Sequence, residues 1–300
     1  MIGPFTIFSQ QQPGCSRGSF GQIVRGKHVS TGAAVAIKLE RKDAVTAGLL
    51  KHECKILHYL TKDRGCENVP RVEWWSTIDW DGIAYRALVI PLYDMTLAEA
   101  IQHDGTVIHH WVREMIRILY QVHEAGILHR DIKPQNFMLR SSSKGSFIYL
   151  IDFGLSSVYV DDAFRGHLPP KPDQEHILGT PKYVSLHVHD GKDASRRDDL
   201  ISVGYVWLFL LLGGRLPWDQ VVHPPSSDTY PAHHIQHPAN VERRRQKQNL
   251  SGEFAVFKRN PLTTTNPHPH SGVCGYLETV YRLGYDERPP YAELIDMVVV

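Results

Sequence analysis

The pattern of apolar and polar positions divides the chain into a first part rich in strands and a remainder rich in helices. Residues 5–40 alternate apolar and polar positions around Gly and Ser turns, which predicts an antiparallel sheet with strands at 23–24 and 35–37. Apolar residues at helical spacing predict a helix over 47–60, and the next strand is expected over 85–93. Further helices are expected over these segments: 97–103, 107–125, 200–212 and from 291 onward.

One segment departs from this pattern. Residues 223–240 are rich in Pro, His and Ser, and the basic run ERRRQK follows at 242–247. The first part predicts an extended loop or insertion, and the basic run is either a solvated face or an anion site. Many of the 18 His residues fall in such Pro-rich loops. Because no Cys or carboxylate partners recur at ligand spacing, a solvated loop is favoured over a metal site.

Composition narrows the class of protein only slightly. The chain has 300 residues and a net charge of +1, which gives no global case for a nucleic-acid or membrane partner. The longest apolar stretch, 203–212, is too short to span a bilayer, and the first residues do not resemble a signal peptide. The four Cys include no CxxC pair, which is typical of free thiols in a reducing compartment. We expect a cytoplasmic monomer, and the basic run could also serve nuclear entry.

The stretch ILHRDIKPQNFML, residues 127–139, carries the residue types that phosphoryl transfer needs. The carboxylate of Asp131 can orient a substrate hydroxyl and accept its proton, and Lys133 can neutralise charge on the moving phosphoryl group. Asn136 offers an amide oxygen to a metal ion. We therefore expect Asp131 and Lys133 to be catalytic and Asn136 to be a metal ligand.

Three more charged residues fit the same chemistry. A hydrophobic strand at 148–151 delivers Asp152, with Phe153 and Gly154 behind it, where a carboxylate can hold Mg²⁺ against nucleotide phosphates. Upstream, Lys38 ends the apolar stretch VAIK and can reach the α- and β-phosphates. Glu53, in the helix expected over 47–60, can hold that lysine by an ion pair. The alternative for this pair is two ordinary surface charges.

The stretch SRGSFG, residues 16–21, has the spacing of a glycine-rich phosphate loop with Ser16 in place of the first glycine. Gly18 and Gly21 are kept where the backbone approaches phosphate most closely. Phe20 can cap the phosphates against water, and Arg17 places a cation at the tip. We expect the loop and the strand after it to contact the nucleotide through these residues: Cys15, Ser16, Arg17, Gly18, Ser19, Phe20, Gly21, Gln22 and Ile23.

In this order, SRGSFGQIV, VAIK, Glu53, HRDIKPQN and DFG resemble a eukaryotic protein kinase over about residues 5–297. The resemblance implies ATP and Mg²⁺ as cofactors and an α+β, two-lobed protein kinase fold. A small N-lobe at about 1–90 would hold an antiparallel sheet and one helix. A hinge at about 91–95 would lead to a larger, mainly helical C-lobe at about 96–300, the whole forming one kinase domain.

The resemblance also implies how adenine would be held. Ile90 takes the gatekeeper position, the Pro91 carbonyl would accept from the adenine amino group, and the Tyr93 amide would donate to the ring. The missing N–H of a proline is one that this hinge does not need. The apolar walls around the base would be Ile23, Ala36 and Met138, for which plain core packing is the alternative.

A narrower resemblance lies in LGTPKYVSLHVHDGKDASRRDDLISVGY, residues 178–205. It lacks the usual A-P-E and is similar to the casein kinase 1 hallmark GTxRYxSxxxHxGxxxSRRDDLxSxGY; VAIKLE, VPRVEWW and GGRLPW also fit. Tau-tubulin and vaccinia-related kinases have similar text, but the intact SRRDDL favours casein kinase 1. This implies that Asp199 starts a buried helix and bonds the catalytic-loop backbone, and that activation-loop phosphorylation is unnecessary.

The casein kinase 1 resemblance implies a serine/threonine kinase for protein substrates with an acidic or phosphorylated residue on the N-terminal side of the target. A basic pocket would read that residue through charge-assisted hydrogen bonds. Lys182 would form one wall of the pocket. It stands where the family has an arginine, and a lysine lacks the two-pronged guanidinium that binds phosphate bidentately. The expected second wall is Arg243, Arg244, Arg245 and Lys247, for which a solvated face is the alternative.

Two other functional classes, a pseudokinase and a small-molecule kinase, stay open at this point. A pseudokinase that acts as a scaffold is suggested by the missing first glycine, the unusual activation segment and the insertion, although none of the six charged or amide residues of the site is lost. A small-molecule kinase on the same fold would lack the GTxxYxS substrate-docking segment that this chain has.

Overall fold

The computed structural model describes residues 2–8, 16–18, 21–44, 48–80, 82–101, 105–143, 145–161, 166–220, 230–258 and 271–298. For 16–18, 21, 250–258 and 271 it describes the backbone alone. Of the expected nucleotide contacts, Cys15, Ser19 and Phe20 lie outside the described residues. The chain divides into two compact units, Met1–Met95 with Met138–Ser156, and Thr96–Phe137 with Ser157–Val300.

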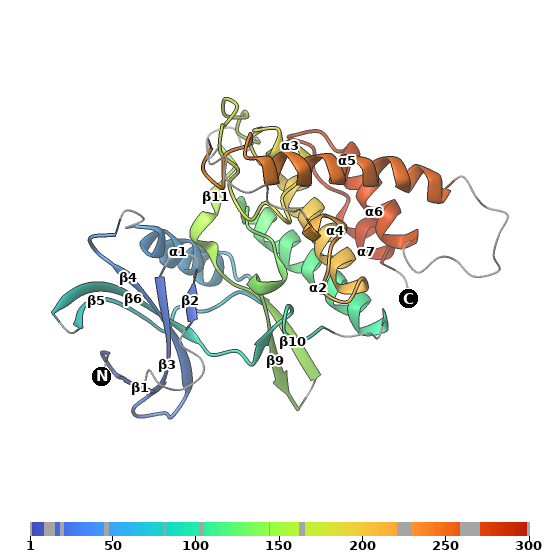
Figure 1. Cartoon of the computed structure of the whole chain (residues 1–300). Helices are drawn as coiled ribbons and strands as arrows, with labels where there is room; N and C mark the ends of the chain where they lie inside the picture. The colour runs from blue at the N-terminus through green and yellow to red at the C-terminus, as the bar shows by residue number, and fades with distance from the viewer. Residues whose placement is uncertain are drawn as a thin grey trace. The chain divides into compact units, whose positions relative to one another are not determined.

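The first unit is built on an antiparallel sheet of order β1-β3-β4-β6-β5, with β2 paired to β3 (Figure 1). Its strands are β1 (Phe5–Ile7), β2 (Ser16–Gly18), β3 (Gly21–His28), β4 (Ala34–Arg41), β5 (Trp74–Trp80) and β6 (Ile83–Pro91). The strands predicted around 23–24, 35–37 and 85–93 are confirmed as β3, β4 and β6. A second sheet of order β10-β9-β7 is made by β7 (Met95–Thr96), β9 (Phe137–Ser142) and β10 (Gly145–Leu150).

Alternation along β4 separates a core face from a half-buried face. Val35, Ile37 and Leu39 are buried in one apolar cluster, whereas Ala36 and Lys38 are half-buried on the opposite face. The cluster is completed by residues of the neighbouring strands and the N-terminal turn: Ile2, Phe5, Val24, Ala87 and Val89. Burial of one face therefore sets the register that leaves Lys38 on the other.

The helix of the first unit is α1 (Leu49–His58), which confirms the helix predicted over 47–60. Its end differs, because the chain continues into a π-helical turn at Tyr59–Asp63, where the Arg64 amide donates to the Tyr59 carbonyl at 3.1 Å. The short turn η3 (Phe153–Leu155) lies against α1. The His52 ring donates to the Ser156 carbonyl at 2.9 Å and ties the two together.

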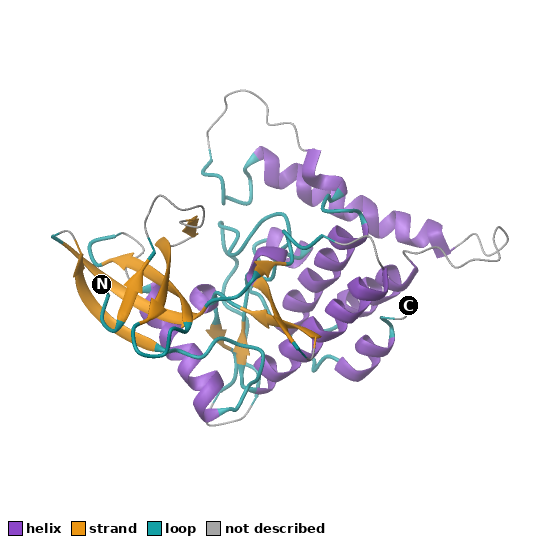
Figure 2. Ribbon diagram, turned by 90° about the horizontal axis from the view of Figure 1, so that it is seen from below, coloured by secondary structure: helices purple, strands orange, loops and turns teal. Residues whose placement is uncertain are grey.

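The second unit is mainly helical (Figure 2). Its helices are α2 (Gly105–Glu124), α3 (Leu186–His189), α4 (Arg196–Leu211), α5 (Pro238–Lys258), α6 (Ser271–Arg282) and α7 (Tyr291–Asp296). Short strands β8 (Ile127–Leu128) and β11 (Ser157–Val158) pair, and single turns form at η2 (Pro134–Asn136) and η4 (Pro217–Gln220). The helices predicted over 107–125, 200–212 and from 291 are confirmed as α2, α4 and α7.

Helix α4 is the centre of this unit. It is buried almost all around and lies against α2 and α6, so its sequence carries no polar stripe. It begins four residues before the predicted start, because the Asp198 carboxylate accepts from the Ser195 amide at 2.8 Å and closes the first turn. Gly204 lets α6 approach closely, since a Cβ at that position would collide with Leu277.

The helix predicted over 97–103 is wrong for the described residues 97–101. A single turn forms there, in which the Ala100 amide donates to the Thr96 carbonyl at 3.0 Å. Thr96 and Glu99 cap one another, with the Thr96 amide donating to the Glu99 carboxylate at 2.7 Å. One turn already buries Leu97 and Ala100, so the apolar spacing is satisfied without a longer helix.

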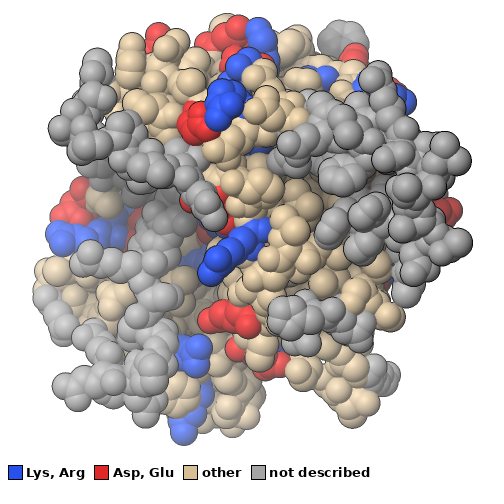
Figure 3. All heavy atoms as spheres, turned by 45° about the vertical axis from the view of Figure 1, so that its right-hand side comes forward, with Lys and Arg blue, Asp and Glu red and all other residues tan. Residues whose placement is uncertain are grey.

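Residues 230–240 are the described part of the segment predicted to be an extended loop or insertion. Its last residues are helical instead, because α5 begins at Pro238. The basic run that follows lies on α5. On the face drawn in Figure 3, basic and acidic side chains lie in small groups among uncharged ones. No helix in the described part of the chain is both long and apolar enough to cross a membrane.

Candidate active site

In the first unit, Lys38 is held between two carboxylates. Its ammonium donates to Glu53 Oε1 at 2.6 Å and lies 3.7 Å from Asp152 Oδ1. Burial by itself would lower the pKa of Lys38, but the negative charges of Asp152 and Glu53 outweigh burial, so the pKa is raised. The lysine therefore stays charged across the whole physiological range. The ion pair inferred from the sequence between a strand lysine and a helix glutamate is present.

A second buried glutamate positions the helix that carries Glu53. Glu40, two residues after Lys38 on β4, accepts from the Gly48 amide at 3.0 Å and the Leu50 amide at 3.1 Å. These are N–H groups at the start of α1, which otherwise lacks a side-chain cap. Arg86 on β6 donates to Glu40 at 3.0 Å and balances its charge. The sequence analysis missed this role, although the last letter of VAIKLE was the available signal.

The described ends of the stretch SRGSFG, residues 16–18 and 21, lie in paired strands. Strand β2 pairs with β3 so that Ser16 faces Ile23, Arg17 faces Gln22 and Gly18 faces Gly21. The two glycines retained from the phosphate-loop pattern are therefore cross-strand partners. Ser16 takes part in an ordinary antiparallel pair, a backbone conformation that does not require glycine.

Three of the residues expected around adenine, Ile23, Ala36 and Ile90, lie on the same face of the sheet as Lys38. Ala36 pairs with Ile90, and Lys38 pairs with Ile23, so these four side chains share one face. Ile23 and Ala36 are half-buried, as is Met138 on β9. Within the described residues, the Tyr93 amide donates to no acceptor, whereas the Leu92 amide donates to Ala34 at 3.2 Å.

The Tyr93 ring is fixed by the first unit itself. It is buried and lies 4.7 Å from the ring of Tyr149 on β10, measured between ring centroids. The position expected for the hinge is thus anchored by a buried side chain, and no described residue accepts from its backbone amide.

The catalytic-loop residues of the second unit converge on one carboxylate. Lys133 donates to Asp131 Oδ2 at 2.6 Å, and the Thr180 hydroxyl donates to Asp131 Oδ1 at 2.7 Å. Lys133 also lies 3.3 Å from the Thr180 hydroxyl. The Asn136 amide group donates to the Asp131 carbonyl at 2.8 Å and to Oδ2 at 3.2 Å. Both oxygens of Asp131 are thereby oriented, and a cation stands beside them.

The backbone of this loop is held by Asp199 on α4. Its two oxygens accept from the His129 and Arg130 amides, each at 2.8 Å, and Oδ2 lies 3.0 Å from His123 Nε2. His123 in turn contacts the Tyr291 hydroxyl at 2.6 Å. Burial would raise the pKa of Asp199, but the hydrogen bond and charge of His123 and the His129 amide lower it overall. The bond between Asp199 and the catalytic-loop backbone is confirmed.

Gly179 brings Thr180 to the catalytic loop. Its φ is 96°, and a Cβ at this position would lie 2.5 Å from the Arg130 carbonyl oxygen. Arg130 itself has a φ of 67°, which the two hydrogen bonds at Asp199 support. Glycine is therefore required for the close approach that puts Thr180 on Asp131.

A family profile described as the protein kinase domain matches residues 13–267 of the chain. The chain belongs to the protein kinase family. The observed architecture is the protein kinase fold, with an antiparallel sheet and a helix in the N-terminal region and a helical C-terminal region. Protein kinases use ATP with a divalent metal and act on protein substrates.

The residues of this kinase that were expected to bind a substrate phosphate already have partners. Lys182 donates to Asp219 at 2.7 Å and lies over the Phe209 ring at 4.7 Å. The guanidinium of Arg244 is bonded to Asp190, while Arg245 donates to Glu242 at 2.8 Å.

The other two basic residues of the expected wall also face the protein. Arg243 is half-buried and donates to Asn240 at 3.1 Å. Lys247 is buried and donates to the carbonyls of Pro181 at 2.9 Å and Val184 at 2.7 Å. Burial, and secondly the charge of Arg243, lower the pKa of Lys247. Lys247 of the basic run thus supports the segment after Thr180, while Arg244 and Arg245 of the same run carry charge at the surface.

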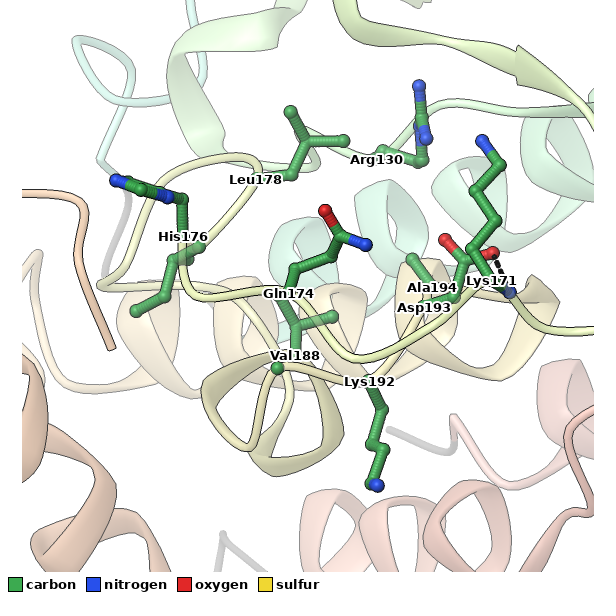
Figure 4. A pocket seen from close by; sticks show the side chains of 11 residues that line it. Arg130, Lys171, Gln174, His176, Leu178, Val188, Lys192, Asp193 and Ala194 are labelled. Carbon is green, nitrogen blue, oxygen red and sulfur yellow. Dashed lines mark hydrogen bonds between the residues drawn. The ribbon is translucent and has the colours of Figure 1, made fainter. Parts of the chain in front are cut away.

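A separate pocket of about 300 Å³ lies beside the catalytic loop in the second unit (Figure 4). Its charged lining residues are Arg130, Lys171, Lys192 and Asp193. The Lys171 amide donates to the Asp193 carboxylate at 3.1 Å, and Lys192 donates outside the pocket to Asp173 at 2.6 Å. In Figure 4 the side chains of Arg130 and Lys171 turn to the same side, whereas Lys192 points the other way. Leu178, Val188 and residues 191–194 of this lining belong to the stretch 178–205 that resembles casein kinase 1, and Arg130 belongs to HRDIKPQN, but none of them was predicted to line a pocket.

Proposed function

We propose that this protein kinase transfers the γ-phosphoryl group of ATP to Ser or Thr hydroxyls of protein substrates. The observation that carries the proposal is the Asp131 carboxylate, oriented by Thr180 on one oxygen and by Lys133 on the other. A carboxylate held in this way can accept the proton of an incoming aliphatic hydroxyl as the oxygen attacks phosphorus.

The roles that we assign follow from charge and position. Asp131 is the base, and Lys133 lies where it can neutralise charge that develops on the transferred group. Lys38, kept charged by Glu53 and Asp152, is assigned to the α- and β-phosphates. The Pro91 carbonyl and the Tyr93 amide are assigned to the adenine edge, and Ile90 is the proposed gatekeeper. The loop from Cys15 to Ile23 is assigned to the phosphates.

Asn136 and Asp152 are the proposed Mg²⁺ ligands. The amide nitrogen of Asn136 donates to Asp131, and these bonds fix the direction of the Asn136 Oδ1. No described residue donates to this Oδ1. Carboxylate and amide oxygens are hard ligands of the kind Mg²⁺ prefers. The described residues hold no cluster of three or more His, Cys, Asp or Glu side chains for a metal, which fits an ion that takes its other ligands from phosphates and water. When bound, the ion would supply charge neutralisation on those phosphates.

We further propose a casein kinase 1-like enzyme, with residues 1–300 as one kinase domain. The charged residues of SRRDDL support this placement, since each has a structural partner. Arg196 donates to the Asp286 carbonyl at 2.5 Å, and Arg197 donates to the Leu283 carbonyl at 2.8 Å. Asp198 accepts from the Ser185 hydroxyl at 2.5 Å. With Asp199 on the catalytic loop, the motif ties the activation segment and the C-terminal region to α4.

Transfer of labelled phosphate from ATP to casein and to Ser, Thr and Tyr peptides tests the activity. We expect label on Ser or Thr, and loss of at least about 10²-fold in kcat for Asp131→Asn. Gln135→Ala is the matched control, because this exposed residue of the same loop touches none of the reacting groups. Wild-type activity no higher than that of Asp131→Asn refutes the proposal. If Mg-nucleotide then still raises the melting temperature, the protein is a nucleotide-binding scaffold.

Preference for acidic or phosphorylated substrates is a separate proposal about the basic residues. A peptide array that compares primed and unprimed copies of each sequence measures it directly. We expect priming to lower the peptide KM, and Lys182→Ala to remove most of that advantage. Lys182 must exchange its bond to Asp219 for one to substrate, so Asp219→Asn is expected to increase the advantage. Equal KM values for primed and unprimed peptides would contradict this preference.

A further inference from the structure

Residues 230–240 dock on residues 175–177 of the second unit, in the activation segment just before Gly179 and Thr180. The Ile177 amide donates to the His233 carbonyl at 2.7 Å, and the Ile235 amide donates to the Glu175 carbonyl at 2.9 Å. Between these bonds, His176 and His234 form an isolated antiparallel bridge. Two backbone bonds around a bridge give the contact the register of a short β-ladder. The insertion is thus an added edge for the activation segment.

Side chains reinforce this ladder. Ile235 packs against the apolar cluster of Ile177, Val184 and Val188, all three of which are buried. The ring centroids of His176 and His234 are 5.3 Å apart, and the Tyr230 ring stacks on His234 at 4.3 Å. The insertion therefore contributes apolar contact as well as backbone bonds.

The docking residues are themselves anchored to α5. The Asn240 side chain is fully buried and donates to the carbonyls of Ala232 at 2.9 Å and His234 at 3.0 Å. Arg243 donates to the Asn240 oxygen at 3.1 Å. A buried amide that satisfies two loop carbonyls holds the loop in one conformation.

The opposite edge of the same strip is also bonded. The Gln174 amide donates to the Gly191 carbonyl at 2.7 Å, and a Cβ on Gly191 would collide with the Gln174 carbonyl. Residues 174–177 therefore lie between Gly191 on one side and the insertion on the other. Gln174, His176, Ile177 and Leu178 form one wall of the pocket in Figure 4, and Gly179 and Thr180 follow directly.

We propose that residues 230–240 are a positioning segment for the protein substrate. They hold the wall 174–178 and the segment that follows it in the conformation that receives a peptide, without contacting ATP or the reacting groups. This inference rests on the proposed kinase activity. Ile235 is the decisive residue, because it supplies both an amide in the ladder and a side chain in the apolar cluster.

The test compares Ile235→Asp and the milder Ile235→Ala with Gln236→Asp. Gln236 is the adjacent residue and its side chain is exposed, so its variant adds the same charge to the same loop without entering the cluster. Peptide KM, ATP KM and kcat are measured, together with hydrogen exchange of the peptide covering 174–178 and the melting temperature. We expect Ile235→Asp to speed exchange over 174–178 and to raise the peptide KM about tenfold, since binding must then order this wall. Ile235→Ala should give a smaller change in the same direction.

ATP KM and kcat should stay within about twofold in both Ile235 variants, and Gln236→Asp should match the wild type in every readout. Unchanged exchange over 174–178 would overturn the inference, because the insertion would then not hold the wall. Faster exchange with an unchanged peptide KM would overturn it too. If Ile235→Asp melts far below the wild type, Ile235→Ala decides by the same criteria. Absence of peptide phosphorylation by the wild type would refute the proposed function instead, and the exchange data would still show whether the insertion holds the wall.

Discussion

The Thr180 hydroxyl donates a 2.7 Å hydrogen bond to Oδ1 of Asp131, across 49 positions of the sequence. Gly179 makes the approach possible, and Lys133 occupies the other oxygen of the carboxylate. A residue of the activation segment thus orients the proposed base. The activation segment and the catalytic loop are one structural unit in this kinase.

Replacing Thr180 by Val should remove this donor with little change of volume. We expect kcat for peptide phosphorylation to fall about 10- to 100-fold, because Asp131 loses the hydroxyl that orients its Oδ1, while Lys133 and Asn136 still contact Oδ2. ATP KM should change less than about threefold, as Thr180 belongs to the second unit and Lys38 to the first. Thr180→Ser keeps the hydroxyl and should retain most of the activity. A Val variant as active as the Ser variant would show that this bond is dispensable.

Glu40 should matter for stability and for nucleotide binding. Glu40→Ala leaves two amides of α1 and Arg86 without their acceptor, and should lower the free energy of unfolding by about 2–4 kcal/mol. ATP KM should rise, since α1 carries Glu53. Urea unfolding and steady-state kinetics measure the two effects. Glu73→Ala removes an exposed glutamate of the same unit and should change neither.

Asp199→Asn should lower stability and rate together. The asparagine can offer only one acceptor oxygen where Asp199 accepts two amide hydrogens and faces His123, so about 2–4 kcal/mol of unfolding free energy should be lost. The strained Arg130 backbone would lose its support, and kcat should fall. Asp296→Asn, on the exposed face of α7, is the control. A drop in kcat at unchanged stability would assign Asp199 a role beyond holding the loop.

His189 should make the fold sensitive to mild acid. Burial, and then the charges of Lys247, Arg243 and Arg244, lower its pKa to about 2 from the ordinary 6.5. The unfolded chain therefore takes up the proton first as pH falls, and stability is lost below 6.5. Between pH 7.5 and 5.5 the wild type should lose about 1.4 kcal/mol more than His189→Gln. Equal losses in urea titrations at the two pH values would contradict this origin.

The sheet, the group of residues around Lys38 and the group around Asp131 could be predicted from the sequence because their signals are local. Alternation of Val35, Ile37 and Leu39 with Ala36 and Lys38 states which face of β4 is buried. The order of residues in HRDIKPQN indicates which side chains gather around Asp131. The predicted helix over 97–103 was wrong because three or four apolar positions fit a single capped turn as well as a helix.

The basic residues show where prediction from the sequence ended. The casein kinase 1 resemblance assigned Lys182 and the run on α5 to a phosphate pocket, and the sequence could not say that Asp219, Asp190 and Glu242 lie against them. The first two of these acids are 37 and 54 positions away from their partners. Which acid neutralises a cation depends on how the chain folds back on itself.

By itself the sequence determined the strands, the main helices, the ion pair of Lys38 with Glu53 and the residue types around Asp131, because each depends on periodicity or on a short motif. Only the tertiary structure decided that Glu40 caps α1, that Lys247 is buried beneath the segment after Thr180, and that the insertion forms an edge for the activation segment. These contacts join residues far apart in the chain. Their free energy comes from burial and from hydrogen bonds that form only once both partners are in place.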